Sequence, residues 1–250
     1  MKATGRPALA DRRLWETRHN HYVNVLCEAL SLLRRKDSLP EDELELNREL
    51  WFCILTARRG LDPSGRFPLP VPEGQNLPDP NAAATQPHDR KKPDFQWIHD
   101  DPQEPDPRYG VRSFAVECKR LGKKTEGGLV LNKEYIDNGA LRFRSPEYRY
   151  SHYLAEGAMI GYVQTMDPEA IHSEVCQQAA TAQLPILQIG PEGWKPQATT
   201  QLAHRFQRPF PRSPFDLTHL WLDIRDMPVR ATGPGKQNKP ETRRPRRKRR

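Results

Sequence analysis

Cysteine is scarce in this sequence of 250 residues, and long apolar runs are absent from it. The four cysteines, at positions 27, 53, 118 and 176, form no CxxC pair and no Cys/His spacing of the kind that binds zinc. We therefore expect buried thiols in a reducing, cytoplasmic environment rather than a disulfide framework. No apolar run approaches the roughly 20 residues that a membrane-spanning helix needs, so we expect no membrane partner.

Two catalytic signatures are also missing. There is no glycine-rich phosphate loop, which argues against ATP hydrolysis by the chain itself, and the eight histidines form no HxxxH or HNH-like cluster. Hydrophobic residues make up 36% of the chain, which has 25 prolines and a mean hydropathy of −0.86. Part of the chain is therefore expected to be loop or tail rather than packed core.

Positive charge is abundant, but its excess is confined to one end. The formal net charge is +8, and residues 231–250 hold nine Lys and Arg against one Glu. The basic and acidic residues of the rest of the chain are therefore equal in number. We predict a disordered basic tail over 227–250 that attracts nucleic-acid phosphates. A solubilising tail and a nuclear localisation signal are the alternatives. The candidate nucleic-acid-binding residues of the tail are Arg243, Arg244, Arg246, Arg247, Lys248, Arg249 and Arg250.

Hydrophobic periodicity predicts helices and strands in alternation over residues 1–226. The expected helices cover 11–35, 41–59, 132–143 with Asn132 as N-cap, and 168–180 after an Asp167 N-cap; the expected strands cover 95–98, 113–121, 158–163 and 217–224. Residues 60–93, with eight prolines, are expected to form a long loop. We therefore predict a single α/β (α+β) domain with a mixed central sheet flanked by helices.

Residues 113–121 show the clearest strand pattern in the chain. Because side chains alternate along a strand, positions 114, 116 and 118 present Phe, Val and Cys on one face, which is suited to packing on a helix. The other face presents Glu117 and Lys119 side by side after a small alanine. An acid and a base on a strand otherwise suited to burial require an explanation.

Phosphodiester hydrolysis provides one. That reaction needs a hard cation such as Mg²⁺ or Mn²⁺, held by one or two carboxylates and by the substrate phosphate. It also needs positive charge near the phosphate and a group that orients or deprotonates water. Glu117 and the backbone carbonyl of Cys118 are the candidate metal ligands here, and Lys119 is the candidate charge beside the water and the phosphate.

A second carboxylate must come from elsewhere, and Asp94 is the best candidate. It opens residues 94–98, a short apolar run that could pair antiparallel with the strand at 113–121. Pro-Asp also occurs at 78–79 and at 105–106, but only Pro93-Asp94 leads directly into such a run. The alternative for Asp94 is an ordinary turn or strand-start residue.

The acid-x-Lys spacing is weak by itself, because Asp89 and Lys91 match it too, in a polar loop. The alternative for Glu117 and Lys119 is a solvated face of an edge strand with ordinary cross-strand contacts. The apolar opposite face of 113–121 favours the metal-site interpretation.

Pro93-Asp94, followed 23 residues after Asp94 by Glu117-x-Lys119, resembles the PD-(D/E)XK (restriction-endonuclease-like) nuclease superfamily. The resemblance implies an αβββαβ core over about residues 41–163 and metal-dependent cleavage centred on Asp94, Glu117 and Lys119.

In that superfamily a preceding helix often brings another acid to the site. In the helix at 41–59, Glu43 and Asn47 share a stripe with apolar residues, whereas Glu45 and Glu49 fall on the polar side. The resemblance therefore assigns the additional ligand role to Glu43. The alternative is an acid in the first helical turn, favoured by the helix dipole.

A second resemblance, to bacterial nuclease-like proteins of mobile-element and phage-defence loci, rests on Asn132-x-x-Tyr135, Gly139, Arg142-Phe143 and residues 156–163. Gln164, at the end of the strand at 158–163, could face a nucleic-acid substrate. We interpret Arg142 as a helix-surface charge, although it could also reach a phosphate. Arg120 points with Cys118 by strand parity, away from the acidic face.

The leading hypothesis is a metal-dependent endonuclease that cleaves DNA rather than RNA. It would act with partner subunits of a bacterial defence or mobile-element system, and homo-oligomerisation is left open. A non-catalytic nucleic-acid-binding or assembly subunit on a nuclease-like fold is the alternative of another class, and an RNase is a third.

Overall fold

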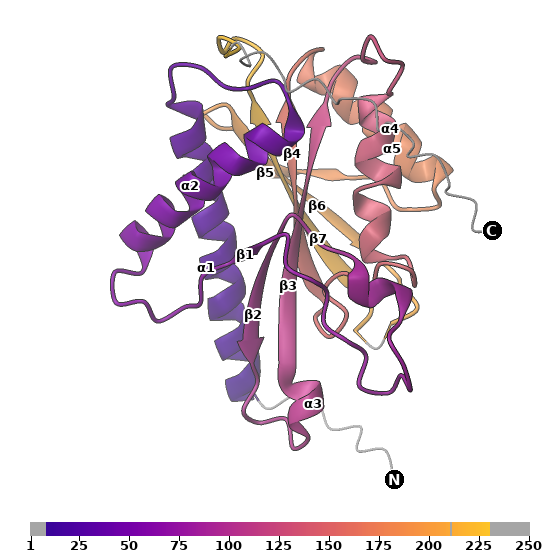
Figure 1. Cartoon of the computed structure of the whole chain (residues 1–250). Helices are drawn as coiled ribbons and strands as arrows, with labels where there is room; N and C mark the ends of the chain where they lie inside the picture. The colour runs from indigo at the N-terminus through magenta and orange to yellow at the C-terminus, as the bar shows by residue number, and fades with distance from the viewer. Residues whose placement is uncertain (1–8, 211, 231–250) are drawn as a thin grey trace, which may run out of the picture.

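The computed structural model describes residues 9–210 and 212–230, and in this part seven strands form one mixed sheet of order β1-β2-β3-β4-β7-β6-β5 (Figure 1). The strands are β1 (Val71–Pro72), β2 (Phe95–Asp100), β3 (Val111–Leu121), β4 (Glu156–Val163), β5 (Gln188–Trp194), β6 (Thr199–Phe206) and β7 (Phe215–Asp223). The helices are α1 (Leu9–Arg34), α2 (Glu43–Leu61), α3 (Pro107–Gly110), α4 (Leu131–Asp137) and α5 (Pro168–Thr181), with 3-10 turns η1 (Pro87–Arg90) and η2 (Ala140–Phe143). The predicted α/β class with a helix-flanked mixed sheet is confirmed.

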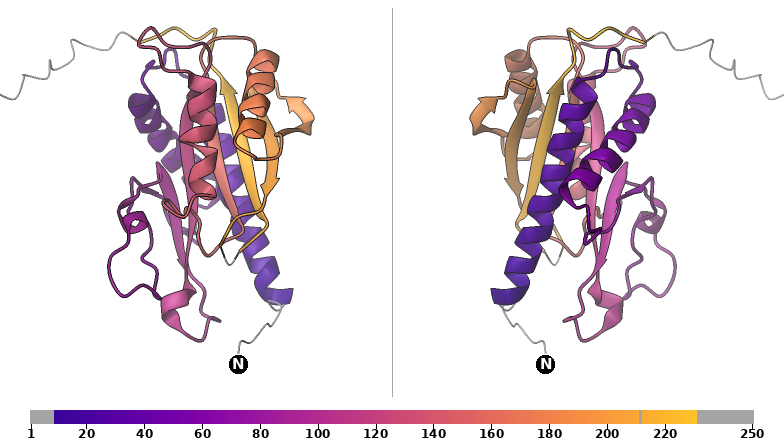
Figure 2. Two further views of the ribbon diagram at one scale, coloured as in Figure 1. Left: turned by 90° about the vertical axis from the view of Figure 1, so that its right-hand side faces the viewer. Right: turned by 90° about the vertical axis from the view of Figure 1, so that its left-hand side faces the viewer.

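Helices cover both faces of the sheet. Helices α1 and α2 lie on one face, and α4 and α5 lie on the other (Figure 2). The alternation of β3 decides which core each residue joins: Phe114, Val116 and Cys118 pack with α1 and α2, whereas Ala115 and Leu121 pack with α4 and α5. The predicted apolar face of this strand is therefore correct. Both faces are buried, as expected for parallel central strands.

The centre of the sheet is parallel and its flanks are antiparallel. Strand β3 pairs parallel with β4, and β4 pairs parallel with β7. Strand β2 pairs antiparallel with β3, from Phe95 opposite Val116 to Asp100 opposite Val111, as predicted for the run after Asp94. The sequence pattern missed β5 and β6. Strand β6 alternates buried and exposed residues next to β7, but β5 is a largely exposed, irregular edge strand with little apolar signal.

The predicted helix at 132–143 is wrong in two respects. It divides into α4 and η2, with Gly139 between them, and the residue that precedes α4 is Val130 rather than Asn132. Asn132 lies inside the helix, where its side chain accepts a hydrogen bond from Gly122 N (3.0 Å) and donates to Glu174 (2.8 Å). The contacts of Asn132 with other elements therefore outweigh its local preference for the N-cap position. The Asp167 N-cap of α5 is confirmed, since its side chain accepts from Glu169 N.

Residues 60–93 are mainly irregular, as predicted, but they are fastened to the segment before β4. Asp79 forms a salt bridge with Arg149 (2.7 Å), Lys91 forms one with Glu147 (2.5 Å), and the Asn76 side-chain amide donates to the Tyr148 carbonyl (2.5 Å). The loop thereby carries the chain from α2 to the start of β2, next to Asp94.

The described chain continues past β7 and packs back onto the junction of α1 and α2. Leu39 and Val229 form an isolated β-bridge. Glu49, predicted on the polar side of its helix, is instead buried and forms salt bridges with Lys36 (2.5 Å) and Arg230 (2.7 Å). These contacts were invisible to helical periodicity because both partners lie outside the helix. Within the described ranges, no helix is both long and apolar enough to cross a membrane.

Candidate active site

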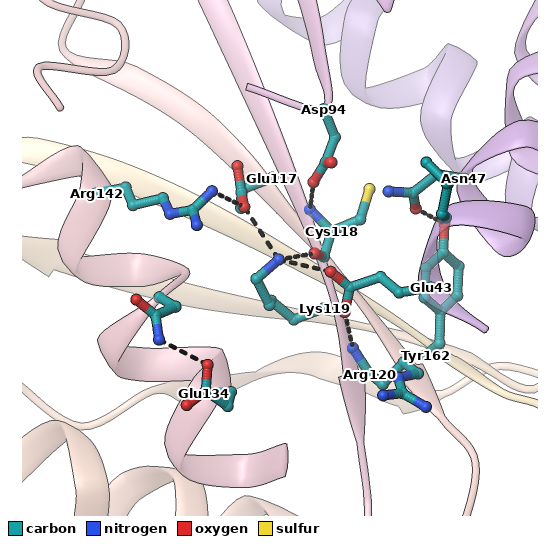
Figure 3. Close-up of polar contacts among 12 residues, drawn as sticks. Glu43, Asn47, Asp94, Glu117, Cys118, Lys119, Arg120, Glu134, Arg142 and Tyr162 are labelled. Atoms are coloured by element: carbon teal, nitrogen blue, oxygen red, sulfur yellow. Dashed lines mark hydrogen bonds and ion pairs between the residues drawn. The ribbon is translucent and has the colours of Figure 1, made fainter. Parts of the chain in front are cut away.

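The site lies where β2 and β3 separate. Strand β2 begins at Phe95, opposite Val116, so β3 continues to Leu121 with only β4 as a strand neighbour over its last residues. The backbone N–H groups on the side that β2 leaves open need other acceptors. Two carboxylates provide them: Asp94 Oδ2 accepts from Cys118 N at 2.6 Å, and Glu43 Oε2 accepts from Arg120 N at 3.1 Å (Figure 3).

Lys119 connects the acidic groups of the site. Its ammonium Nζ lies 2.7 Å from Glu43 Oε1 and 3.1 Å from Glu117 Oε1, and it donates to the Cys118 carbonyl at 2.8 Å (Figure 3). The first residue of α2, 76 residues away in the sequence, is in this way tied to the end of β3. The helix begins there because Asp42 caps it, accepting from Leu44 N and Glu45 N.

Glu117 is the most enclosed carboxylate of the group. Its side chain is 1% exposed, and Oε1 accepts from Lys119 and forms a salt bridge with Arg142 (2.5 Å). Its second oxygen, Oε2, is buried and has no hydrogen-bond partner among the described residues. A buried carboxylate oxygen without a partner is costly, and such an atom in a polar cluster is a candidate ligand for a cation.

Burial dominates the electrostatics of the two central acids. It raises the pKa of Glu117 to about 8, with the neighbouring Asp94 adding to the effect. It also raises the pKa of Asp94 to about 6, against the opposing influence of Lys119 and the Cys118 N–H. Burial lowers the pKa of Lys119, but Glu117, Glu43 and Asp94 outweigh it and raise that pKa above its ordinary value. Lys119 is therefore a cation at neutral pH and not a base.

The donor set suits a hard divalent cation with few protein ligands. No group of three or more His, Cys, Asp or Glu side chains in the described part of the chain is arranged to hold a metal ion. Mg²⁺, however, commonly takes only one or two carboxylates and completes its coordination with water and substrate phosphate. Glu117 Oε2, and Asp94 Oδ1, which has no hydrogen bond to the described residues, are the oxygens available for that role.

The structure brings most of the predicted site residues together: Asp94, Glu117, Lys119, the Cys118 carbonyl and Glu43. The Cys118 carbonyl and both oxygens of Glu43 are already hydrogen-bonded, so these two are poorer ligand candidates than the sequence suggested. Gln164 lies at the end of β4, where its side-chain amide donates to the Glu41 carbonyl (2.6 Å). The seven tail residues predicted to bind nucleic acid lie outside the described residues.

Arg142 is the residue that the sequence interpretation placed wrongly. It is a partner of Glu117 from η2, only 22% exposed, and not a helix-surface charge (Figure 3). No local signal could have shown this, because the contact spans 25 residues and depends on the turn at Gly139. Tyr162 was likewise missed: its hydroxyl donates to Asn47 Oδ1 at 2.9 Å and fixes α2 over the sheet.

No family model, no curated protein and no solved structure matches this chain. A functional proposal therefore depends on the geometry described above.

Proposed function

We propose that this chain is a metal-dependent nuclease that hydrolyses phosphodiester bonds at the cluster of Asp94, Glu117 and Lys119. The observation that carries the proposal is the buried Oε2 of Glu117, which has no hydrogen-bond partner in the described part of the chain. It lies beside a second carboxylate and the Lys119 ammonium. Apart from the four-residue helix α3 and the 3-10 turns η1 and η2, the elements from α2 to β4 follow the order α2, β1, β2, β3, α4, β4. That is the αβββαβ order that the resemblance to PD-(D/E)XK nucleases implies, and it supports the proposal.

Each residue has a role that follows from its surroundings. Glu117 and Asp94 would hold a Mg²⁺ or Mn²⁺ ion, which when bound supplies positive charge to the phosphate and lowers the pKa of water. Lys119 stays protonated and contributes a positive charge next to the phosphate oxygens. Glu43 positions Lys119 by its 2.7 Å salt bridge.

One further function fits a specific observation. Lys119 and Arg142 both contact Glu117 Oε1, and this closed arrangement could be a purely structural neutralisation of a buried acid. The chain would then be a non-catalytic nucleic-acid-binding subunit.

A cleavage assay separates the two. The purified chain is incubated with plasmid DNA, single-stranded DNA and RNA, in Mg²⁺, Mn²⁺ or EDTA. We expect cleavage with a divalent metal and none with EDTA. Asp94→Asn, Glu117→Gln and Lys119→Met should each lower the rate by about a hundredfold or more. Asparagine at 94 keeps an oxygen for the Cys118 N–H, so that variant removes the charge and retains the backbone contact.

Lys123→Ala is the matched control, because Lys123 is an exposed lysine just beyond the end of β3. Its cleavage rate should equal that of the wild type, and circular dichroism should show that all variants are folded. Full activity in a folded Lys119→Met protein would exclude this mechanism. Binding of nucleic acid without cleavage under either metal would identify the non-catalytic subunit.

A further inference from the structure

A cavity of about 750 Å³ opens beside the carboxylate cluster on the α4 side of the sheet. Its wall combines apolar and cationic side chains, among them Leu141, Tyr148, Arg142, Arg144 and Arg208. Its volume is in the range of sites that take a small organic ligand or one or two units of a polymer. Nothing in the roles assigned to Asp94, Glu117 and Lys119 accounts for it.

The positive charge of the cavity is only partly neutralised. The two acids in its wall already have lysine partners, Asp137 with Lys133 and Glu147 with Lys91. Arg144 donates to the backbone carbonyls of residues 182 and 183 and forms no salt bridge among the described residues.

Arg208 is also a cation without a carboxylate partner in the described part of the chain. Its guanidinium donates to carbonyl oxygens of residues 143, 150, 151, 154 and 212. Burial lowers the pKa of Arg208 to about 9, so it remains charged at neutral pH. With Arg144 it gives the cavity a field that favours an anionic ligand.

Arg142 joins this cavity to the carboxylate cluster. It lines the cavity, its Nη1 contacts Glu117 Oε1, and its guanidinium carbon lies 5.0 Å from the centre of the Tyr148 ring. Its Nε is buried without a hydrogen-bond partner in the described chain, so the guanidinium is not saturated by the protein. A guanidinium of this kind can exchange a carboxylate oxygen for a phosphate oxygen with the same geometry.

We propose that the cavity binds unpaired nucleotides of a single nucleic-acid strand and that Arg142 passes from Glu117 to a backbone phosphate of that strand. This inference rests on the proposed nuclease function. Glu117 is 1% exposed and its partner Arg142 lines the cavity, so a phosphate bound in the cavity would meet Arg142 rather than Glu117 itself. A rigid duplex, with paired bases, cannot enter a cavity of this size, whereas a single strand can place its bases on apolar residues and its phosphate on Arg142.

The proposal assigns Arg142 two opposing effects. It attracts the strand, and it competes with a metal ion for Glu117. Arg142→Ala should therefore weaken nucleic-acid binding and leave metal binding equal or tighter. A purely structural arginine would weaken both when it is removed, because the Glu117 pocket would collapse.

Two measurements test this on the full chain without relying on cleavage. Fluorescence anisotropy in EDTA gives the affinity for short labelled oligonucleotides, as single-stranded DNA, single-stranded RNA and duplex DNA. Titration of Mn²⁺ followed by electron paramagnetic resonance, without nucleic acid, gives metal affinity. Arg205→Ala is the control, since Arg205 is an exposed arginine paired with Asp216 on the other side of the sheet. The basic tail is present in every variant, so its contribution cancels.

We expect the wild type to bind a single strand more tightly than the duplex, and Arg142→Ala to lose about tenfold in single-strand affinity. The affinity of Arg142→Ala for the duplex should equal that of the wild type. The Arg205→Ala protein should bind all the oligonucleotides as tightly as the wild type. Equal losses for single strand and duplex, no loss for either, or weaker Mn²⁺ binding in Arg142→Ala would each overturn the inference. Absence of Mn²⁺ binding by the wild type would overturn the nuclease proposal instead. The oligonucleotide measurement would still test whether the cavity binds a single strand.

Discussion

At the scale of single residues, the environment of the Glu117 side chain is unusual. It is almost fully buried, two cations share one of its oxygens, and the other oxygen has no partner among the described residues. Its elevated pKa means that folding, in the absence of a metal, favours the protonated acid. A divalent ion would reverse that preference, because a ligand carboxylate must be ionised. In the proposed nuclease, the protonation state of Glu117 would therefore depend on whether a metal ion is bound.

This leads to a prediction about pH. The pKa of Glu117 is about 8 in the fold against an ordinary value of 4.5, so between these pH values the folded chain holds a proton that the unfolded chain has released. Stability from this group is thus lost as pH rises through that window, by at most about 1.4 kcal/mol per unit. Glu117→Gln should remove this loss. The melting temperature of the variant minus that of the wild type, both measured in EDTA, should therefore increase from pH 5 to pH 8.

The comparison must be a difference between the two proteins, because buried histidines act in the opposite sense. Burial lowers the pKa of His99 and of His204 to about 4, so their contribution to stability rises with pH up to about their ordinary value of 6.5. Both proteins share that contribution, and it cancels. A difference in melting temperature between the two proteins that stays constant from pH 5 to pH 8 would contradict the assignment of a raised pKa to Glu117.

At the scale of elements, the site depends on where strands and turns end. Because β2 begins only opposite Val116, the backbone of Cys118 and Arg120 is left open to side chains. The break between α4 and η2 turns Arg142 toward Glu117. Gly139 makes that break possible. A Cβ atom there would lie 2.3 Å from the Tyr135 carbonyl oxygen and 2.4 Å from the end of the Met159 side chain.

We therefore predict that Gly139→Ala displaces η2. Because the nearest obstacle is backbone, the chain must shift, at a cost of about 1–3 kcal/mol in unfolding free energy. The same shift should move Arg142 away from the cavity wall, so single-strand affinity should fall as in Arg142→Ala. Chemical denaturation and fluorescence anisotropy measure the two effects. The control is Gly127→Ala, because a Cβ there would meet only the Thr125 hydroxyl at 3.9 Å; equal behaviour of the two variants would refute the role given to Gly139.

At the scale of the whole molecule, helices on both faces of one sheet enclose the acids, while the excess positive charge of the sequence lies in the tail. We therefore expect the tail and the cavity to make separable contributions to nucleic-acid binding. The tail should supply affinity that depends on salt, and the cavity should supply the preference for a single strand.

Replacing the seven basic residues of 243–250 by glutamine tests this division. The slope of log affinity against log salt for a single strand should become shallower by up to about 5, at roughly 0.7 for each phosphate that the variant no longer neutralises. The ratio of single-strand to duplex affinity should stay constant. A changed ratio with an unchanged slope would show that the two contributions had been assigned the wrong way round.

The sequence by itself determined the helix-flanked α/β class, the antiparallel pairing after Asp94 and the shared face of Glu117 and Lys119, because hydrophobic periodicity and strand parity are local properties. Side-chain parity along one strand needs no knowledge of its neighbours. The same patterns failed for β5, an exposed edge strand whose residues need little hydrophobic signal, and for Asn132, whose partners lie in other elements.

Only the tertiary structure decided how the acids are used. It tied Glu43 to Lys119 across 76 residues, left Glu117 Oε2 without a partner in the described chain, and placed Arg142 between the carboxylate and a cavity. Such contacts depend on how separate elements pack, since residues distant along the chain become neighbours only when the layers close on the sheet. A sequence motif can therefore identify a carboxylate and a lysine as candidates, but only the packing around them sets their charge and their exposure.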